Sequence, residues 1–327
     1  MNRSAPRSAG RDGEWRLLDG VLLFDKPSGI TSNAAVQRVR RLFRVEKAGH
    51  TGTLDPMATG LLPVCLGEAT KFSHLLLEAD KAYAATILLG VTTSTGDLEG
   101  KVTARSKVQA EREEIEHVLK RFVGQILQTP PMYSAIKRGG QPLYKLARAG
   151  GEVPRTPRSI FIRSLTLLGL EGEELKVSVS CSKGTYIRVL AEDIGRQLGC
   201  GACLSALRRE GVGDFRLSQS TVTLEQLEQM APAERDALLL PEDALVSSLP
   251  RLDLDAAGAL RLRHGQSVDR SETHVEGLAR IYGPSREFLG VGEVTSPGII
   301  VPRRLVSTAR AAPQTGQVLL EKPWVSG

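Results

Sequence analysis

Residues 49–60, GHTGTLDPMATG, constrain the fold of this chain more than any other stretch. Three glycines and a proline exclude a regular helix there, and Pro56 disfavours the helical conformation at Asp55, which precedes it. The apolar run Leu61–Leu66 follows at once. We therefore expect a shaped loop that holds Asp55 and leads into a buried segment. An aspartate in such a loop is more often a turn former or a helix cap than a catalyst, so the loop alone assigns no function.

The spacing of apolar residues elsewhere predicts a mixture of strands and helices. Residues 20–25 form a short apolar run that ends in a turn signal at residues 26–29, as expected for a strand that enters a loop. Residues 83–91 and 174–181 are also predicted strands. Because strands and helices do not alternate regularly, the chain is predicted to be an α+β protein rather than a doubly wound parallel sheet. The apolar stripes with helical spacing are Val36, Val39 and Phe43, and Ile115, Val118, Leu119 and Phe122.

The composition changes at several points along the chain. Residues 1–15 are basic and lack an apolar run, so we interpret them as a flexible tail. Prolines and glycines interrupt residues 129–158 throughout, and such a long basic excursion predicts a loop that grips a substrate. Short apolar runs separated by glycine and proline indicate a small β-barrel over residues 249–307, after a larger domain at 16–248. Residues 308–327 show no period and are predicted to be a second tail.

The distribution of charge favours a polyanionic partner. The chain has a formal net charge of +6, and two basic runs, at residues 38–47 and 137–163, concentrate it. Either run alone would be read as a solvated face. Two runs, one of them interleaved with Tyr133 and Tyr144, make contact with RNA the better interpretation. The candidate RNA-binding bases in the second run are Lys137, Arg138, Lys145 and Arg148.

Several classes of protein are disfavoured by the sequence. No run approaches the roughly 20 apolar residues of a membrane span, and the N-terminus lacks the apolar stretch of a secretory signal. Four scattered cysteines are too few for a disulfide framework, which fits a reducing, cytoplasmic setting. Cys200 and Cys203 form a Cys-x-x-Cys pair, but no second pair completes a zinc site, so no bound metal is expected.

A set of long motifs occurs along residues 18–217. They are residues 25–32 (DKPSGITS), 49–71 (GHTGTLDPMATGLLPVCLGEATK), 81–83 (KAY), 130–135 (PPMYSA), 142–144 (PLY), 184–188 (GTYIR) and 207–209 (LRR). The set resembles the signature of the TruB-type family of tRNA pseudouridine-55 synthases. Residues 249–307 more loosely resemble a PUA domain, a small RNA-binding barrel. Two positions depart from the family pattern, with Cys203 where histidine is common and Ser94 where an acidic residue is common.

The resemblance implies an enzyme that isomerises uridine 55 in the T-loop of tRNA to pseudouridine. The implied fold is a mixed, largely antiparallel sheet in an α+β catalytic domain, followed by the small β-barrel. The reaction breaks the N1–C1′ bond, rotates the uracil and joins C5 to C1′, so it needs no redox agent, metal or nucleotide, and no cofactor is expected. The expected partner is the T-arm of tRNA, without a membrane or an obligate protein partner, and the protein is expected to be a monomer.

The resemblance also assigns roles to individual residues. The family's catalytic aspartate falls on Asp55, whose carboxylate could stabilise positive character at C1′, attack as a nucleophile or remove the C2′ proton. The sequence leaves these three routes open. A charged carboxylate in a pocket that excludes water needs a cation nearby, and the resemblance assigns that cation to Arg188. The active-site tyrosine falls on Tyr83, which would stack on the target base and help to remove the C5 proton.

Three further residues are carried over to the binding pocket. Tyr186 resembles a second pocket tyrosine, His50 a residue that fills space where the base leaves the stack, and Leu207 an apolar wall. Each could instead be an ordinary packed or hydrogen-bonded residue. If residues 184–188 are extended, Tyr186 and Arg188 share one face, whereas a helix would separate them by roughly 200°. A common pocket therefore favours an extended backbone here.

Two other functions fit parts of the sequence. A non-catalytic RNA-binding or RNA-folding protein could use the same basic surface, but binding alone has no use for a desolvated carboxylate that faces phosphates. A guide-RNA-dependent pseudouridine synthase subunit of a ribonucleoprotein is the second alternative. The basic segment at residues 129–158, which a stand-alone tRNA reader needs, argues against it.

Overall fold

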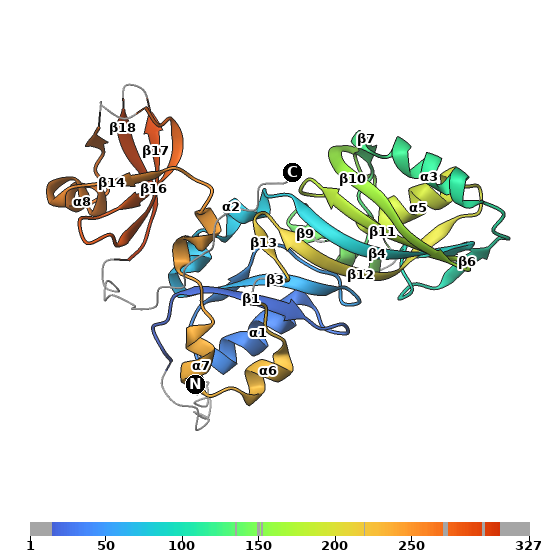
Figure 1. The fold of residues 1–327 in the computed structure, drawn as a ribbon, viewed down its shortest axis with the longest axis horizontal. Helices are drawn as coiled ribbons and strands as arrows, with labels where there is room; N and C mark the ends of the chain where they lie inside the picture. Colours follow the sequence, from blue (N-terminus) through green and yellow to red (C-terminus); the bar gives the residue numbers. More distant parts are fainter. Residues whose placement is uncertain are drawn as a thin grey trace, which may run out of the picture.

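The computed structural model describes residues 15–134, 136–148, 151, 153–218, 220–270, 274–295 and 298–307. Apart from Trp15, the two predicted tails lie outside this part of the chain. Figure 1 shows a large body built on one broad sheet and a smaller C-terminal body beside it.

A nine-stranded mixed sheet forms the large body. Its strands follow the order β1-β3-β12-β4-β11-β10-β7, with β2 paired to β3 and β13 to β12. All of these pairs are antiparallel except β12 with β3. The prediction of an α+β fold with a largely antiparallel sheet is therefore confirmed. The strands are β1 (Gly20–Lys26), β2 (Ala48–His50), β3 (Thr59–Leu66), β4 (Lys81–Leu89), β7 (Gly124–Gln128), β10 (Arg158–Glu171), β11 (Glu174–Cys181), β12 (Ala202–Val212) and β13 (Phe215–Arg216).

Helices cover this sheet in two groups. α3 and α5 pack on each other and on β10 and β12, whereas α1, α6 and α7 gather beside β1 (Figure 1). α1 begins where the Thr31 hydroxyl accepts a hydrogen bond from the Ala34 amide at 3.1 Å, as an N-cap does. The helical elements are α1 (Ser32–Phe43), η1 (Gly67–Lys71), α2 (Ser73–Leu77), α3 (Arg112–Arg121), α4 (Leu143–Arg148), α5 (Ile187–Gln197), α6 (Leu224–Gln229), α7 (Pro232–Ala237), η2 (Glu242–Val246) and α8 (Ala256–Arg263).

The end of the sheet formed by β1 and β3 is covered on both faces. Leu62 in β3 belongs to the core that α1 covers, whereas Leu61 belongs to the core on the opposite face, together with Phe72. A strand covered on both sides is apolar at nearly every position. This explains the continuous apolar run at 61–66 and fixes the end of the Asp55 loop rigidly in the protein.

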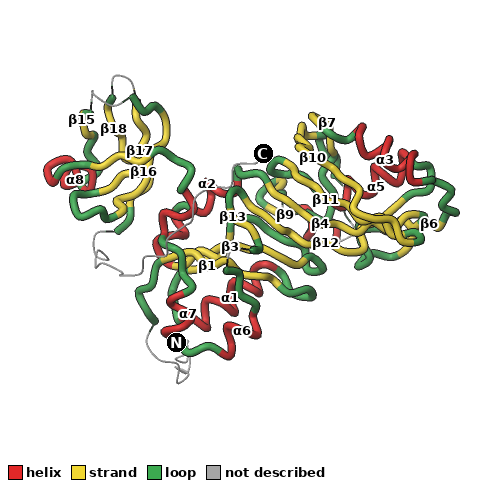
Figure 2. The backbone as a smooth tube through the Cα atoms, viewed as in Figure 1, coloured by secondary structure: helices red, strands yellow, loops and turns green. Residues whose placement is uncertain are grey.

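The C-terminal elements form a second sheet with its own core. Its order is β14-β16-β17-β18-β15, and the sheet curls into a half-barrel (Figure 2). Leu252, Ile281 and Ile300 are buried between this sheet and α8. The strands are β14 (Arg251–Asp253), β15 (Val268–Asp269), β16 (Gly277–Tyr282), β17 (Phe288–Thr295) and β18 (Ile299–Leu305).

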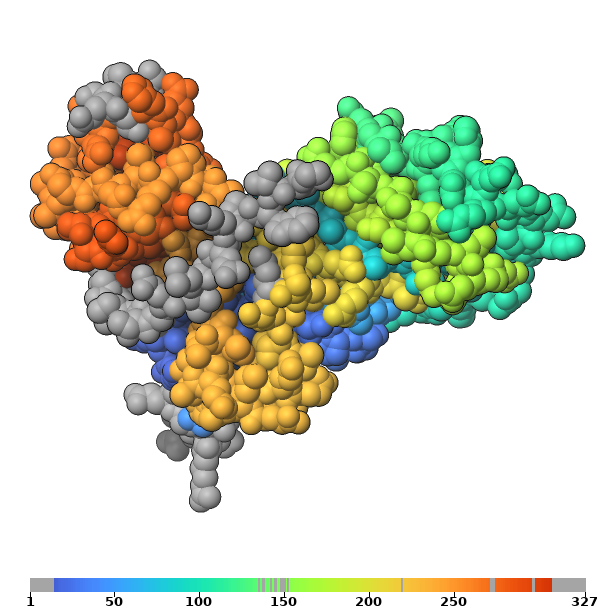
Figure 3. All heavy atoms as spheres, viewed as in Figure 1, coloured from blue at the N-terminus to red at the C-terminus, as the bar shows by residue number. Residues whose placement is uncertain are grey.

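The two bodies are packed against each other. The Phe288 ring of β17 lies 5.2 Å from the ring of Phe72, and Val291 joins the second core of the large body. The Ser307 amide donates a hydrogen bond to the Glu68 carboxylate at 2.6 Å. Figure 3 shows the C-terminal body as a separate lobe. Because its strands supply side chains to a shared core, deletion of the lobe would expose apolar surface on the large body.

Two predicted segments differ in detail from the sequence-based expectation. Residues 83–91 were predicted as one strand, but the chain breaks at Gly90, which has φ 77°, and continues as β5 (Val91–Thr93). Residues 129–158 were predicted as a long loop, yet they include regular elements. These are the hairpin of β8 (Lys137–Arg138) and β9 (Gln141–Pro142), and the short helix α4. The remaining strand, β6 (Val102–Arg105), pairs with β5.

Candidate active site

The loop that carries Asp55 is braced by two side chains from the first part of the chain. The buried ammonium group of Lys26 donates to the carbonyl oxygens of Pro27 at 2.8 Å and Ala58 at 2.7 Å. The Ser32 hydroxyl donates to the Leu54 carbonyl at 3.0 Å and accepts from the Leu54 amide at 2.7 Å. These bonds satisfy backbone groups that the irregular loop cannot pair internally. They hold the backbone on both sides of Asp55.

Arg188 connects Asp55 to a second, buried aspartate. Its Nε lies 2.9 Å from Asp55 Oδ2 and 3.5 Å from Asp97 Oδ2. The terminal nitrogens donate to the carbonyl oxygens of Thr95 at 2.9 Å and Tyr133 at 2.8 Å. The guanidinium is thus fixed on several sides. The predicted pair of Asp55 and Arg188 is present, and Asp97 is an additional partner that the sequence-based prediction missed.

The two aspartates occupy different environments. The Asp97 side chain is only 4% exposed, whereas that of Asp55 is 36% exposed. Burial raises the pKa of Asp55 above its usual range, and the charge of Arg188 opposes that shift. The charge of Asp97 raises the pKa of Asp55 further. Asp55 is therefore a poorly solvated carboxylate whose charge is offset mainly by Arg188, with a smaller contribution from Lys26.

The backbone around Arg188 corrects one prediction. Tyr186 is extended, with φ −101° and ψ 108°, but it is the N-cap of α5, and Arg188 already lies in the first turn of that helix. The extended backbone predicted for residues 184–188 is therefore wrong in its last part. The two side chains nevertheless share a site, because Asp55 and Arg188 both affect the pKa of Tyr186, which burial raises. The Gln128 side chain anchors the cap by accepting from the Tyr186 amide at 2.8 Å and donating to its carbonyl at 3.1 Å.

Tyr83 lies in the central strand β4 and is paired with Arg209 across the sheet. The two residues are directly opposite each other in the register of β4 and β12, so their side chains lie on the same face of the sheet, and each affects the pKa of the other. Tyr83 is 9% exposed. Burial raises the pKa of its hydroxyl, the charge of Arg209 lowers it, and the charge of Asp55 contributes as well. Tyr83 and Asp55 are therefore electrostatic neighbours.

His50 and Leu207 complete the set of predicted pocket residues. His50 ends β2, and its Nδ1 accepts a hydrogen bond from the Gly52 amide at 3.2 Å. Burial and the charge of Arg209 lower the pKa of His50, which favours the neutral ring. Leu207 lies in β12 opposite Ala85, one step along the same sheet face from the pair of Tyr83 and Arg209, and is 8% exposed. Both positions border the site.

Other predicted features fall elsewhere. The side chains of Lys137, Arg138, Lys145 and Arg148 lie outside the described part of the structure, so their contacts stay predictions. Cys200 and Cys203 are buried free thiols, and the described residues contain no cluster of three or more histidine, cysteine or acidic side chains that could hold a metal. In the described ranges, no helix has both the length and the apolar character to cross a membrane.

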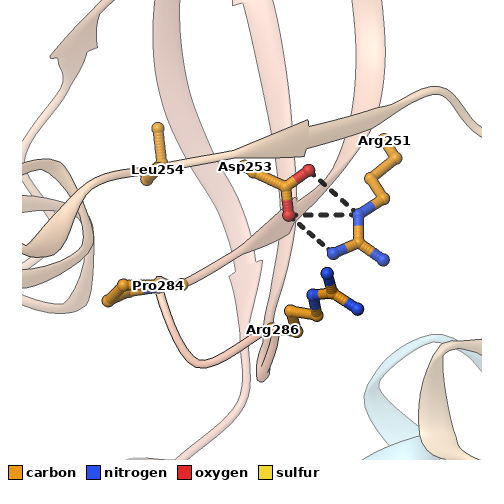
Figure 4. A pocket seen from close by; sticks show the side chains of 6 residues that line it. Arg251, Asp253, Leu254, Pro284 and Arg286 are labelled. Atoms are coloured by element: carbon orange, nitrogen blue, oxygen red, sulfur yellow. Dashed lines mark hydrogen bonds and ion pairs between the residues drawn. The ribbon is translucent and has the colours of Figure 1, made fainter.

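The C-terminal lobe carries a separate pocket of about 490 Å³. Arg251 forms a bidentate ion pair with Asp253 and lies over the Tyr282 ring, with 4.0 Å between its guanidinium carbon and the ring centroid. Figure 4 shows Arg286 on the same side of the pocket as Arg251. The charges of Arg251, Arg286 and Arg270 all lower the pKa of Asp253. Two arginines and one aspartate line the pocket, so its charged side chains carry one net positive charge.

Comparison with solved structures identifies the class of this fold. The structure titled "Structure of H/ACA RNP bound to a substrate RNA containing 2′-deoxyuridine" matches with a TM-score of 0.68 and 25% identity, over 90% of this chain and 87% of that chain. A Cbf5-Nop10-Gar1 complex matches with a TM-score of 0.65 and 29% identity, over 84% and 78% of the two chains. The fold is that of a pseudouridine synthase.

Sequence comparison narrows this class to one family. The description "TruB family pseudouridylate synthase (N terminal domain)" matches residues 40–187, and two C-terminal TruB descriptions match 188–247 and 250–306. The tRNA pseudouridine synthase B of Methylobacillus flagellatus is 54% identical over 90% of this chain and 97% of its own length. That of Azoarcus sp. is 52% identical over 97% of this chain and 100% of its own length. The chain belongs to the TruB family, which confirms the resemblance of its motifs.

Three buried polar residues of the site were not predicted. Lys26, Asp97 and Arg209 are 0%, 2% and 1% exposed. Lys26 ends an apolar run, where a buried charge needs a partner, but Asp97 lies in a turn-forming segment and Arg209 lies between Arg208 and Glu210. Only Lys26 therefore gave a local signal, and the partners of all three residues come from distant segments that only the fold brings together.

Proposed function

We propose that this protein isomerises uridine 55 in the T-loop of tRNA to pseudouridine, with Asp55 as the indispensable carboxylate. The observation that carries the proposal is the contact of 2.9 Å between the partly exposed Asp55 carboxylate and the buried Arg188 guanidinium. A carboxylate held charged in a pocket of low polarity can act on C1′ or C2′ of a ribose placed above it. Family membership supports this chemistry.

We propose a separate role for each residue of the site. The target uridine leaves the T-loop stack and enters the pocket, because a stacked base hides its ribose from a carboxylate. Tyr83 stacks on the flipped base, Tyr186 and Leu207 line the pocket, and His50 fills space at its entrance. The reaction conserves atoms and electrons, so it requires no cofactor.

The proposed RNA-binding surface extends beyond the pocket. Lys137, Arg138, Lys145 and Arg148 in the basic segment at 129–158 contact phosphates, and residues 249–307 act as a PUA-like RNA-binding domain. We propose that the protein works as a cytoplasmic monomer without a guide RNA or protein partner. Its long basic segment and the C-terminal pocket provide the positive surface that a stand-alone reader of tRNA needs.

The direct test uses purified protein and an unmodified T-arm stem-loop. We expect pseudouridine to form at the position of uridine 55 and nowhere else in the stem-loop, as measured by nucleoside analysis and site mapping. A stem-loop with cytidine at that position is the control and should give none. If a full-length tRNA is bound with high affinity but no pseudouridine appears in it or in the stem-loop, the protein is an RNA-binding protein without this activity.

Substitutions of Tyr83 should separate stacking from proton transfer. Tyr83→Leu removes the ring and should cost about 1–3 kcal/mol of stacking on the flipped base. Tyr83→Phe keeps the ring and removes the hydroxyl, so it should lower kcat by about 10²–10⁴ with little change in KM. Single-turnover rates on one stem-loop, with hydrogen or deuterium at C5 of the target uridine, measure both effects. A Tyr83→Phe enzyme as fast as the wild type, without an isotope effect, would limit Tyr83 to stacking.

Loss of positive charge from the C-terminal pocket should weaken binding of full-length tRNA and leave chemistry unchanged. Arg286 is exposed and lines the pocket, so Arg286→Gln removes charge without disturbing the core. We expect a several-fold higher Kd for tRNA and a shallower dependence on salt, because each phosphate contact contributes about −0.7 to −0.9 to the log–log slope. The turnover of a saturating short stem-loop should not change.

The matched control is Arg303→Gln on the same lobe, which removes an arginine that is paired with Glu293. This substitution should affect tRNA binding less. Equal effects of the two substitutions would mean that only the general charge of the lobe matters and that the pocket has no special role. Point substitutions are preferable to deletion of the lobe, because Phe288 and Val291 pack into the core of the large body.

A further inference from the structure

Arg209 has the largest of the fully buried side chains in the described part of the chain. It is 1% exposed, and its contacts are with both ends of the Asp55 loop. Nε donates to the Leu61 carbonyl at 2.8 Å, and a terminal nitrogen donates to the Gly52 carbonyl at 3.1 Å. Tyr83 in β4 lies directly opposite Arg209, so its side chain stands beside the guanidinium on the same face of the sheet. One guanidinium therefore lies between the Asp55 loop, to which it is hydrogen-bonded, and Tyr83.

The backbone geometry is adapted to bring Arg209 to this position. Gly60, with φ 100°, pairs in parallel with Arg209, and a Cβ at Gly60 would lie 2.3 Å from the Arg209 carbonyl oxygen. Only glycine permits such a close approach. The loop that carries Asp55 can thus end directly against β12. Arg209 is held here by the backbone as well as by its side-chain contacts.

Arg209 differs from Arg188 because it has no acidic partner among the described residues. Arg188 lies between Asp55 and Asp97, whereas Arg209 donates to two carbonyl groups and has Tyr83 as its cross-strand neighbour. A guanidinium keeps its charge in proteins. A buried cation without a counter-ion is costly, and this cost falls when a neighbouring group becomes negative. Tyr83 is the described neighbour that can do so.

We propose that Arg209 is a positioning residue for the isomerisation, which holds the Tyr83 hydroxyl in place and stabilises the phenolate that later accepts the C5 proton. When the N1–C1′ bond breaks, its electron pair stays on N1, and the uracil takes a proton from the Tyr83 hydroxyl, directly or through water. After C5 joins C1′, the C5–H bond breaks, its electron pair restores the ring double bond, and the proton returns to Tyr83. Protons and electrons balance, and the transient phenolate is paired with Arg209.

Several other groups that titrate face the pair of Tyr83 and Arg209. The charge of Arg209 lowers the pKa of His50 in β2. The charges of Cys181 in β11 and of Asp55 raise the pKa of Tyr83. Burial, assisted by the charge of Arg209, lowers the pKa values of Lys26 in β1 and Lys81 in β4 to about 8. These lysines can change protonation in the range where the enzyme is assayed. A pH profile of the wild type alone therefore cannot report on Tyr83.

The experiment is a double-mutant cycle that isolates the coupling between the two residues. Single-turnover rates on the stem-loop are measured for wild type, Arg209→Gln, Tyr83→Phe and the double variant, across pH. We expect Arg209→Gln to lower the rate by about 10²-fold, to increase the C5 deuterium isotope effect and to move the pH profile upward. In the Tyr83→Phe background the same substitution should cost less than about threefold. Arg209→Lys, which keeps the charge, should lie between wild type and Arg209→Gln.

Two controls distinguish this role from a structural one. Arg235 also donates to buried carbonyls, those of Leu227 and Leu42, and Arg235→Gln should lower thermal stability without moving the pH profile. Ultraviolet difference titration of each protein against its Tyr83→Phe counterpart reports the ionisation of the Tyr83 phenol directly. It should require a higher pH after Arg209→Gln. This measurement needs no activity, and Arg209→Lys serves if Arg209→Gln does not fold.

Equal losses from Arg209→Gln in the wild-type and Tyr83→Phe backgrounds, with an unchanged phenol titration, would overturn the proposal and leave Arg209 as a brace for the loop. The proposal rests on the proposed role of Tyr83. If Tyr83→Phe is as fast as the wild type, that role fails, whatever Arg209 does. If the wild type makes no pseudouridine, the proposed function itself fails. The three failures give different patterns of rates and can therefore be distinguished.

Discussion

Asp55→Asn is expected to abolish pseudouridine formation in a protein that still folds and binds tRNA. Asparagine keeps the shape of the side chain and loses the charge that is needed beside C1′ or C2′. Removal of an indispensable group lowers rates by about 10⁴-fold or more. Single-turnover assays on the stem-loop, together with Kd measurements on tRNA, should therefore show a lost rate and an affinity within a few-fold of wild type.

Asp97→Asn is the matched control for this substitution. Asp97 Oδ2 lies 3.5 Å from Arg188 Nε, whereas Asp55 Oδ2 lies closer, at 2.9 Å. The Asp97 side chain is also buried. We expect a loss of at most about tenfold, because Arg188 would keep Asp55 as its partner. If the two substitutions reduce the rate equally, or if Asp55→Asn keeps substantial activity, the assignment of Asp55 is wrong.

Asp55→Asn should not destabilise the protein. Burial raises the pKa of Asp55 in the folded state, so this group stabilises the fold at low pH and that contribution is lost as pH rises through the folded-state pKa. At neutral pH the ionised carboxylate is therefore retained at a cost in stability. Asp55→Asn should have a Tm at neutral pH equal to or above that of wild type, and the difference should shrink on acidification.

Local patterns were sufficient to predict much of the fold. The buried stripe of α1 follows from the spacing of Val36, Val39 and Phe43, and β11 from strict alternation. The break at Gly90 and the regular elements within 129–158 were missed, because a single glycine or a two-residue strand gives no periodic signal. Local patterns report each element by itself, whereas pairing of β12 with β3 and β4 depends on contacts far apart in sequence.

The residues of the site were predicted only where they lie within a long sequence motif. Asp55, Tyr83 and Arg188 were identified from motifs, and the structure places them together. The assumption that Tyr186 and Arg188 share a pocket favoured an extended backbone at Arg188, but Arg188 lies in the first turn of α5. Asp97 and Arg209 gave no local signal of their roles. Their importance comes from burial beside residues that are distant in sequence, and burial of a charge is decided by the whole fold.

Arg188→Met is expected to have the largest combined effect on activity and stability. The guanidinium is 5% exposed and supplies the positive charge between Asp55 and Asp97. Its removal leaves Asp97 as a buried carboxylate without that partner, and loss of one member of a buried pair costs about 3–5 kcal/mol. The carbonyls of Thr95 and Tyr133 also lose their donors. Chemical denaturation should report the stability, and single-turnover assays should show a rate near background.

The pH dependence and a second substitution show whether electrostatics causes these losses. Arg188 is the main group that lowers the pKa of Asp55, so its loss should raise that pKa further and protonate Asp55 at a higher pH. Any residual activity should then fall on acidification at a higher pH than in wild type. Adding Asp97→Asn to Arg188→Met removes the unpaired buried charge, and should restore part of the stability but not the rate. If stability does not recover, the loss comes from the broken carbonyl contacts, and if the rate recovers, Asp55 does not need Arg188 to stay charged.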